Sequence, residues 1–401
     1  MGFIFSEIEK LGPAGLVLQA ILGSLLGIVL LVGFIVLRRW YRTRYFRRRN
    51  KRTVVLRSQW DDIISGKISA EDWRFDPIDC EIVESILLDT IEMATPDQLP
   101  KPLDCLRASG LLEMRISEAR MSRGWKRRTA LLALGRTRAM ESIPALAEAL
   151  DSPSQETRIA AVRGLGRIAR MEAAIPILDR VVSGQLDVPE RTLKNTLVNC
   201  CRTHPSILIN YVEQTQGSLR ELLARVLGEL ASPDLGEELL TLAADALPEV
   251  RASAARALGN TKTPFTLPAL HTLATDPEWF VRLRAVVALG QIENIGKIRI
   301  LLRALCDTNR HVRQRAAWAL ARMEPQLEQI LEDVVGTQDD YALQSFISEL
   351  ERSGAIEKLV ATSGFGSDHQ SAQAALMEIV TAVKRRVESS GKTAAVAAGR
   401  S

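Results

Sequence analysis

The chain has few residues of the kinds on which catalysis and metal binding depend. Its four histidines, His204, His271, His311 and His369, stand in separate contexts, with no H-E pair and no Cys/His spacing that suits a metal. The signatures G-x-S-x-G and G-x-G-x-x-G and those of protein kinases are also absent. The sequence therefore predicts no catalytic residue, no metal site and no cofactor, and we expect that the protein is not an enzyme.

Cysteines and aromatic residues are also scarce. The five cysteines include no C-x-x-C pair, and an odd number fits poorly with a disulfide framework, so we expect reduced thiols in a cytosolic body. Adjacent Cys200 and Cys201 are expected to be buried as small apolar side chains. Aromatic residues make up only 5% of the 401 residues, while Ala, Leu and Arg abound, which favours helices over a β-sandwich or barrel. A hydrophobic content of 46% excludes disorder as the main state.

Acidic residues are missing from one stretch near the N-terminus. Nine of the 52 Lys and Arg residues lie between Arg38 and Arg52, which we call the basic collar, and no acid interrupts them. From Thr53 onward, 42 basic and 46 acidic residues give a net charge of −4. This distribution excludes a histone-like polycation, whose charge would be spread along the chain.

A charge-free run precedes the collar. Leu16 to Leu37 is 22 residues long, and at about 1.5 Å per residue it spans roughly 33 Å, enough to cross a hydrocarbon layer of about 30 Å. A cleaved signal peptide is the competing interpretation, but it requires a basic start, a shorter run and a small-residue cleavage site. Here the start is slightly acidic and the run ends in Arg38-Arg39-Trp40-Tyr41. The sequence therefore predicts a retained transmembrane helix.

The collar predicts the orientation of that helix. Because Lys and Arg are retained on the cytoplasmic side, we expect the N-terminus outside and residues 38–401 in the cytoplasm, in a single-pass protein of the cell (inner) membrane. Positions expected at the membrane interface and at anionic lipid headgroups are Arg38, Arg39, Trp40, Tyr41, Arg42 and Arg44. Gly23-x-x-x-Gly27 is a weak signal for a homodimer through the transmembrane helix.

The body consists of internal repeats. Val250 to Gly259 recurs as Val281 to Gly290, and an arginine marks the same place in each copy. These arginines follow one another at nearly constant spacing and are Arg127, Arg158, Arg191, Arg220, Arg251, Arg282 and Arg313. Each copy predicts two helices. The first often opens with a proline (Pro144, Pro176, Pro268), and the second often ends at the glycine. Hairpins of this length must stack into a solenoid to bury their apolar faces.

The repeat resembles the HEAT-repeat family, specifically its short bacterial type with the pattern D-x-x-x-x-x-V-R-x-x-A-x-x-A-L-G. The best matches are Asp245 to Gly259, Asp276 to Gly290 and Asp307 to Ala321. The resemblance implies an all-α fold, a right-handed α-solenoid of about seven to eight HEAT-like helical hairpins, preceded here by the single transmembrane helix. It also implies that second helices line the concave surface.

These patterns predict seven segments. They are a short extracytoplasmic N-terminus (1–15), the transmembrane helix (16–37), a basic juxtamembrane segment (38–57), a helical connector or cap (58–118), the HEAT-repeat solenoid (119–352), C-terminal capping helices (353–388) and a flexible tail (389–401). The copy around Arg191 is degenerate, and Asp339 to Arg352 is a faded eighth unit.

Helical phase separates structural from functional positions. Counted from the repeated arginine, positions +3, +4 and +7 form the core stripe, and the arginine lies within it. We therefore expect the seven arginines to form a structural ladder, with Asp245, Asp276 and Asp307 as partners in the turns between helices.

Positions +2, +5 and +9 fall on the opposite face. Over the seven repeats they make 21 sites, and among these are eight arginines and one acid, Glu229. We call the predicted partner-binding residues on this face the basic ridge: Arg136, Arg163, Arg167, Arg225, Arg256, Arg284, Arg315, Trp318 and Arg322. Arginine is common on any solvated helix face, but a face of one sign favours an acidic partner segment.

The expected function is therefore a membrane-anchored scaffold or adaptor that binds a protein partner, within an inner-membrane complex. The alternative is an enzyme or accessory factor similar to the HEAT-type phycobilisome lyases, although a membrane helix is unexpected there. Nucleic-acid binding through the arginines is a third and weaker alternative, which the membrane anchor disfavours, and we expect no nucleic-acid partner.

Overall fold

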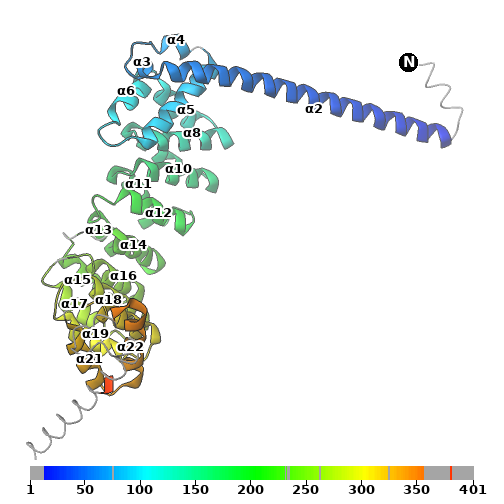
Figure 1. Cartoon of the computed structure of the whole chain (residues 1–401). Coiled ribbons are helices and arrows are strands. Elements are labelled where there is room, and N and C mark those ends of the chain that lie inside the picture. The colour runs from blue at the N-terminus through cyan, green and yellow to red at the C-terminus, as the bar shows by residue number, and fades with distance from the viewer. Residues whose placement is uncertain are drawn as a thin grey trace, which may run out of the picture. The chain divides into compact units, whose positions relative to one another are not determined.

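The computed structural model in Figure 1 describes residues 13–74, 76–230, 232, 235–261, 263–323, 326–355 and 380–381. Regular structure in these ranges is entirely helical, which confirms the all-α prediction. Almost all of the predicted extracytoplasmic N-terminus, most of the predicted capping helices and the whole predicted tail lie outside these residues. The described chain forms two units, Met1–Met121 with Arg136–Ser142 and Ser122–Gly135 with Ile143–Ser401.

The helices follow one another with short connections. In chain order they are α2 (Pro13–Ser58), α3 (Trp60–Ile64), α4 (Glu71–Arg74), α5 (Pro77–Met93), α6 (Pro100–Ala108), α7 (Leu111–Met121), α8 (Gly124–Thr137), the 3-10 helix η1 (Met140–Ser142), α9 (Ile143–Ala149), α10 (Gln155–Ile168), α11 (Met171–Val182), α12 (Glu190–Cys200), α13 (Ile207–Gln214), α14 (Gly217–Leu230), α15 (Glu237–Ala243), α16 (Pro248–Leu258), α17 (Thr266–Leu273), α18 (Trp279–Gln291), α19 (Lys297–Leu305), α20 (Arg310–Leu320), α21 (Leu327–Gly336) and α22 (Asp340–Ser353).

Helix α2 is the dominant feature of the first unit. Its 46 residues, about 69 Å at 1.5 Å per residue, run without a break through both the predicted transmembrane segment and the basic collar. It is the one helix of the described chain that is long and apolar enough to cross a membrane. The described large apolar side chains between Val17 and Leu37 are each at least half exposed, so this stretch is not a core helix of the body.

The C-terminal half of the collar packs against α5 of the same unit. Arg52 donates hydrogen bonds to both carboxylate oxygens of Asp79, with Nε 2.8 Å from Oδ1, and Asp79 is only 3% exposed. Arg48 bonds to Asp76 at 2.9 Å, and Tyr45 donates to Glu81 at 2.9 Å. The collar therefore consists of two groups of residues. The C-terminal group, with Arg48 and Arg52, anchors α2 to the helical connector.

The arginines closer to the apolar run have no such anchor. Arg38, Arg39, Arg42 and Arg44 are exposed and make no ion pair with any residue that the structure describes. The guanidinium of Arg44 instead lies 5.3 Å from the ring centre of Trp40. These predicted interface residues are thus free to meet lipid headgroups.

The second unit consists of helical hairpins stacked in two layers, as Figure 1 shows. We call the second helices of the hairpins, α10, α12, α14, α16, α18, α20 and α22, the inner layer, and each contacts the next. The first helices, α9, α11, α13, α15, α17, α19 and α21, form the outer layer, whose neighbours contact one another more sparsely. Because the inner helices pack more closely than the outer ones, the inner layer lines the concave side of this unit.

Glycines make the close packing of the inner layer possible. A Cβ atom on Gly135 of α8, the helix that precedes the inner layer, would lie 2.5 Å from the Cα of Gly164 in α10, and one on Gly228 would lie 2.8 Å from the carbonyl oxygen of Ser253. The prediction that the second helices end at their glycines holds for α16, where Gly259 is the C-cap, in the right-handed conformation. It is wrong for α10, α14 and α18, which continue past the glycine. They are needed for helix approach, not for a left-handed turn.

The proline prediction also needs correction. Pro144 and Pro268 lie within the first turn of α9 and α17, where their missing N–H groups have no helical acceptor. Pro176, by contrast, lies inside α11, which begins five residues earlier at Met171.

The repeated arginines tie consecutive hairpins together. Arg251 donates to Asp276 with Nε–Oδ2 2.7 Å, and Arg282 donates to Asp307 with the same distance. Arg158 and Arg220 pair in the same way with Asp187 and Asp245. Each carboxylate lies one repeat further along the chain than its arginine.

The same guanidinium groups also close the turn of their own repeat. Arg251 Nη1 donates to the carbonyl oxygen of Asp245 at 2.9 Å, and Arg282 Nη1 donates to that of Asp276 at 2.9 Å. Arg127, Arg191 and Arg313 make no ion pair with any described residue, so the ladder covers four of the seven predicted positions.

We expect the glycine contacts to be testable by a pair of alanine substitutions. Gly135→Ala should lower the free energy of unfolding by about 1–3 kcal/mol, because its Cβ must push α8 and α10 apart. Gly336→Ala should instead raise it by up to about 1 kcal/mol, because nothing lies within 4 Å of that Cβ and alanine is the better helix former. Thermal unfolding of the purified variants checks both signs, and equal shifts would contradict the packing role.

The ladder predicts loss of stability in acid. Burial alone would raise the pKa of Asp276, but hydrogen bonds from Arg251 and from the Glu278 N–H outweigh burial and lower it. The pKa of Asp307 is lowered in the same way, against its burial, by Arg282 and the Asn309 N–H. A carboxylate with a lowered folded pKa stabilises the fold above the unfolded pKa of about 3.9, and this contribution is lost as the pH falls through the folded value.

The melting temperature should therefore fall as the pH drops below about 4. The double substitution Asp276→Asn with Asp307→Asn should lower stability at pH 7 by about 1.5–3 kcal/mol per site and reduce the acid-dependent loss. Asp97→Asn, at an exposed side chain, is the matched control and should change neither. An unchanged acid profile in the double variant would show that the ladder carboxylates are not responsible.

Candidate protein-binding groove

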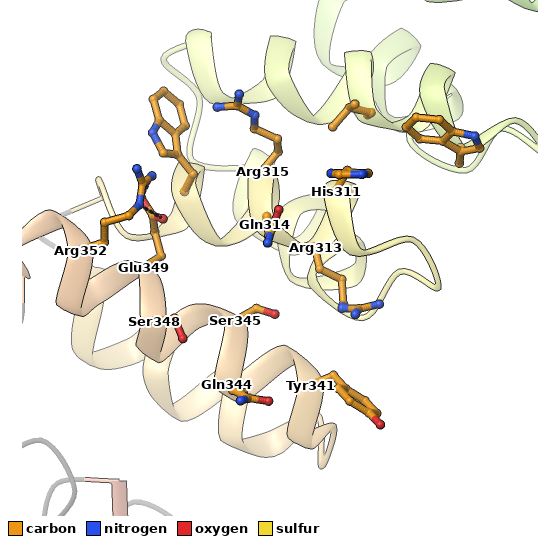
Figure 2. A pocket seen from close by; sticks show the side chains of 13 residues that line it. His311, Arg313, Gln314, Arg315, Tyr341, Gln344, Ser345, Ser348, Glu349 and Arg352 are labelled. Carbon is orange, nitrogen blue, oxygen red and sulfur yellow. Dashed lines mark hydrogen bonds and ion pairs between the residues drawn. The ribbon is translucent and has the colours of Figure 1, made fainter.

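The inner layer carries a groove of about 810 Å³ near its C-terminal end. It lies between α18, α20 and α22, and Figure 2 shows its lining side chains. They are Trp279, Leu283, His311, Arg313, Gln314, Arg315, Trp318, Tyr341, Gln344, Ser345, Ser348, Glu349 and Arg352.

Helical spacing explains why these residues share one groove. On α20, His311, Gln314, Arg315 and Trp318 are spaced three, one and three residues apart, so they lie on one face. On α22 the residues from Tyr341 to Arg352 follow the same spacing. Both helices start at defined caps: Asn309 accepts a hydrogen bond from the His311 N–H, and Asp339 accepts from two backbone N–H groups of α22. The two faces are thereby held opposite each other.

The centre of the groove is polar and uncharged. Gln314 of α20 and Gln344, Ser345 and Ser348 of α22 line it, as Figure 2 shows. Their amides and hydroxyls can both donate and accept hydrogen bonds. Such a surface suits an extended peptide backbone, which needs both kinds of partner.

Aromatic side chains border this centre. Trp279 and Tyr341 are 42% and 70% exposed, and the ring of Trp279 lies 6.0 Å from that of His311. Arg322 stacks on Trp318, with its guanidinium carbon 3.9 Å from the ring centre. Exposed Trp, Tyr and Arg are the residue types that most often anchor protein interfaces.

At one end of the groove, the acid Glu349 is already paired with arginines. Glu349 is only 8% exposed and accepts two hydrogen bonds from Arg352, at 2.8 and 2.9 Å. Arg322 lies 3.6 Å from the same carboxylate. These two arginines more than neutralise the acid, and Arg313 and Arg315 are the lining residues that add unpaired positive charge to the groove.

The structure divides the predicted basic ridge into paired and unpaired residues. Arg136, Arg225, Arg256 and Arg322 make ion pairs with acids on neighbouring helices, for example Arg225 with Glu190 at 2.6 Å. Arg163, Arg167, Arg284 and Arg315 are exposed and pair with no residue in the described ranges. The inner face is therefore less uniformly basic than the sequence suggests, because Glu190 and Glu349 fall outside the counted phases.

The phase analysis is also wrong at position +2. Leu193 and Leu222 occupy this position in two repeats and are 3% and 2% exposed. Inner-layer helices pack side by side, so their buried arc is wider than a single stripe facing the outer layer. Position +2 reaches the surface only in the first repeat, at Thr129, and in the last two, at Arg284 and Arg315.

Sequence analysis missed the contribution of α22. It identified Asp339 to Arg352 as a faded repeat and assigned no site residue to it, yet half of the groove is formed there. The signal was present in the spacing of Tyr341, Ser345, Ser348 and Arg352, which matches one helical face. Without the repeat arginine, nothing marked that face as part of the inner layer.

The described residues hold neither a metal-binding cluster nor reactive thiols at Cys200 and Cys201. Within the described residues, no group of three or more His, Cys, Asp or Glu side chains is placed to hold a metal ion. Cys200 and Cys201 are fully buried, and burial raises the pKa of each thiol to about 12. Both are therefore unreactive packing residues near neutral pH.

Comparisons with known proteins agree with this architecture. The model of the HEAT-repeat family matches residues 113–189, 205–290 and 267–351, which together make up more than half of the chain. A search of curated proteins finds no match.

Solved structures with similar folds include three examples. An engineered protein from the Northeast Structural Genomics Consortium is 17% identical, with 82% of this chain and 99% of that chain covered and a TM-score of 0.35. Kap95p, from a study of its binding to RanGDP, is 14% identical, with 78% and 51% covered and a TM-score of 0.39. The YibA protein of Escherichia coli is 15% identical, with 76% and 96% covered and a TM-score of 0.31.

The repeated helical hairpins, the two-layered packing and the family match lead to one assignment. Solenoids of this kind present extended concave surfaces to protein partners. The chain belongs to the HEAT-repeat family.

Proposed function

We propose that this protein is a membrane-anchored, non-catalytic scaffold whose inner layer binds an acidic segment of a protein partner. The observation that carries the proposal is the groove between α18, α20 and α22, where unpaired arginines border a polar centre and exposed aromatic rings. Positive charge steers an acidic segment to the surface, and the aromatic rings supply the apolar contact.

The proposal places the chain once across the membrane, with the N-terminus outside and the solenoid in the cytoplasm of a bacterial cell. The exposed apolar side chains of α2 from Val17 to Leu37 support this, because a surface of that size is unstable in water. The free arginines that follow it support the orientation. A tether of this kind raises the effective concentration of a membrane-bound partner, so modest contacts suffice.

Membrane insertion is tested by extraction and by mass. The intact protein should remain in the membrane fraction after alkaline carbonate washing and be released by detergent. Its mass should equal that of the full 44.3 kDa chain. A smaller protein that lacks the apolar run, found in the soluble fraction, would identify that run as a cleaved signal sequence instead.

Partner binding is tested by reversing the unpaired inner-layer charges. Arg163→Glu, Arg284→Glu and Arg315→Glu combined should reduce capture of the partner from native membranes at least about tenfold, because an acidic segment would then be repelled. The matched control reverses three exposed arginines outside the inner layer: Arg202, Arg299 and Arg303. The measurement is quantitative mass spectrometry of captured proteins. Equal capture by both triple variants would contradict binding through the inner layer.

A further inference from the structure

Arg313 is the member of the arginine ladder at which the pattern of ion pairs stops. We propose that its guanidinium is a receptor for a carboxylate of the partner, from an Asp or Glu side chain that lies in the groove. This inference rests on the proposed function and names the contact by which the acidic segment is recognised.

The three preceding repeats define what Arg313 lacks. Arg220, Arg251 and Arg282 each donate to the aspartate 25 residues further along the chain. Arg282, for example, bonds to both oxygens of Asp307 at 2.7 and 2.9 Å. This two-bond geometry is the arrangement that guanidinium and carboxylate groups prefer.

Arg313 keeps only half of this arrangement. Its Nη1 donates to the carbonyl oxygens of Asp307 and Thr308, at 2.8 and 3.1 Å, as its counterparts do in their own turns. Its Nε is buried and has no hydrogen-bond partner, and the guanidinium makes no ion pair with any described residue. A buried cationic donor without an acceptor is unfavourable, so the site favours a ligand that supplies one.

A longer repeat accounts for the missing partner. Asp245, Asp276 and Asp307 are equally spaced along the chain, whereas the next aspartate of this turn type, Asp339, comes one position later than that spacing predicts. Gln338 precedes it with a φ of 56°, a conformation that non-glycine residues adopt rarely. Asp339 still caps its helix, but its carboxylate does not pair with Arg313.

The Arg313 side chain borders the groove. Arg313 is one of its lining residues, and the ring of Tyr341 lies 5.6 Å from its guanidinium carbon. Figure 2 shows Arg313 and Tyr341 together, away from Glu349 and Arg352 at the other end. A carboxylate beside Arg313 therefore avoids the one acid of the groove and completes the ladder. The groove is thus asymmetric and would bind an acidic segment in one direction.

The test is a double-mutant cycle between Arg313 and the acidic residue of a bound peptide. The full chain in detergent micelles is panned against a phage-displayed library of random peptides, and the tightest peptide is synthesised in two forms, with its Asp or Glu and with Asn or Gln instead. The two dissociation constants are measured by fluorescence anisotropy with the wild type, with Arg313→Gln and with the control Arg303→Gln.

We expect the change from acid to amide to weaken binding about tenfold in the wild type and in Arg303→Gln, and to have no effect in Arg313→Gln. Should Arg313→Gln fail to fold, the comparison of the two peptides on the wild type alone already decides: equal binding would overturn the inference. It would also be overturned if no acidic peptide binds or if the amide penalty persists in Arg313→Gln.

The two proposals fail separately. Charge reversal of Arg163, Arg284 and Arg315 could abolish partner capture while the acid-to-amide change in the peptide has the same effect on the wild type and on Arg313→Gln. The scaffold function would then stand, and the receptor role of Arg313 would be wrong. If neither has an effect, both proposals are wrong.

Discussion

The close packing of the inner-layer helices underlies both the curvature of the second unit and its arginine ladder. Glycines such as Gly135, Gly164 and Gly228 let neighbouring helices approach to distances at which an added Cβ would collide with backbone atoms. The outer-layer helices, which lack this series of contacts, stay further apart. The unequal spacing curves the stack and gives the second unit an inner surface on which several helices present side chains together.

The arginine ladder follows from the same packing. Helices that approach so closely bring the turn of one repeat near the helix of the preceding one, and the half-buried guanidinium groups of Arg220, Arg251 and Arg282 need acceptors there. The carboxylate of each aspartate accepts hydrogen bonds from the arginine of the preceding repeat, and its backbone carbonyl oxygen accepts from the arginine of its own repeat. Where the spacing of the repeat changes, after Asp307, the cross-link is missing and a cationic group is left at the surface of the groove.

Much of the fold could be predicted from the sequence because it repeats. The near-constant interval between the arginines, the Val-Arg pair and the small residues at fixed distances from it specify hairpins, a core stripe and a ladder. The candidate site was less predictable, because it depends on contacts between repeats. Glu190 and Glu349 neutralise predicted ridge arginines from neighbouring helices, and Leu193 and Leu222 are buried by side-by-side packing that a single helical wheel does not represent.

Near the N-terminus, the continuity of helix α2 shows a role of the basic collar that its composition did not suggest. The nine positive charges of the basic collar suggest a single role, which is to set the orientation of the helix in the membrane. Helix α2 continues through them, however, and Arg48, Arg49 and Arg52 lie next to acids of α5 and its N-cap. The part of the collar that follows the apolar run remains free. Within the first unit, the proposed membrane helix is thus joined to the helical connector through one continuous helix and not through a loose linker.

The proposed partner lies against the inner layer, in the groove between α18, α20 and α22. Site-specific photo-crosslinking in native membranes tests it most directly, with the crosslinking amino acid at Gln314 or Gln344 in the groove and at Arg299 or Arg303 on α19 of the outer layer. A partner bound in the groove should be crosslinked from both groove positions and from neither outer position. Crosslinks to a common partner from α19 alone would contradict it.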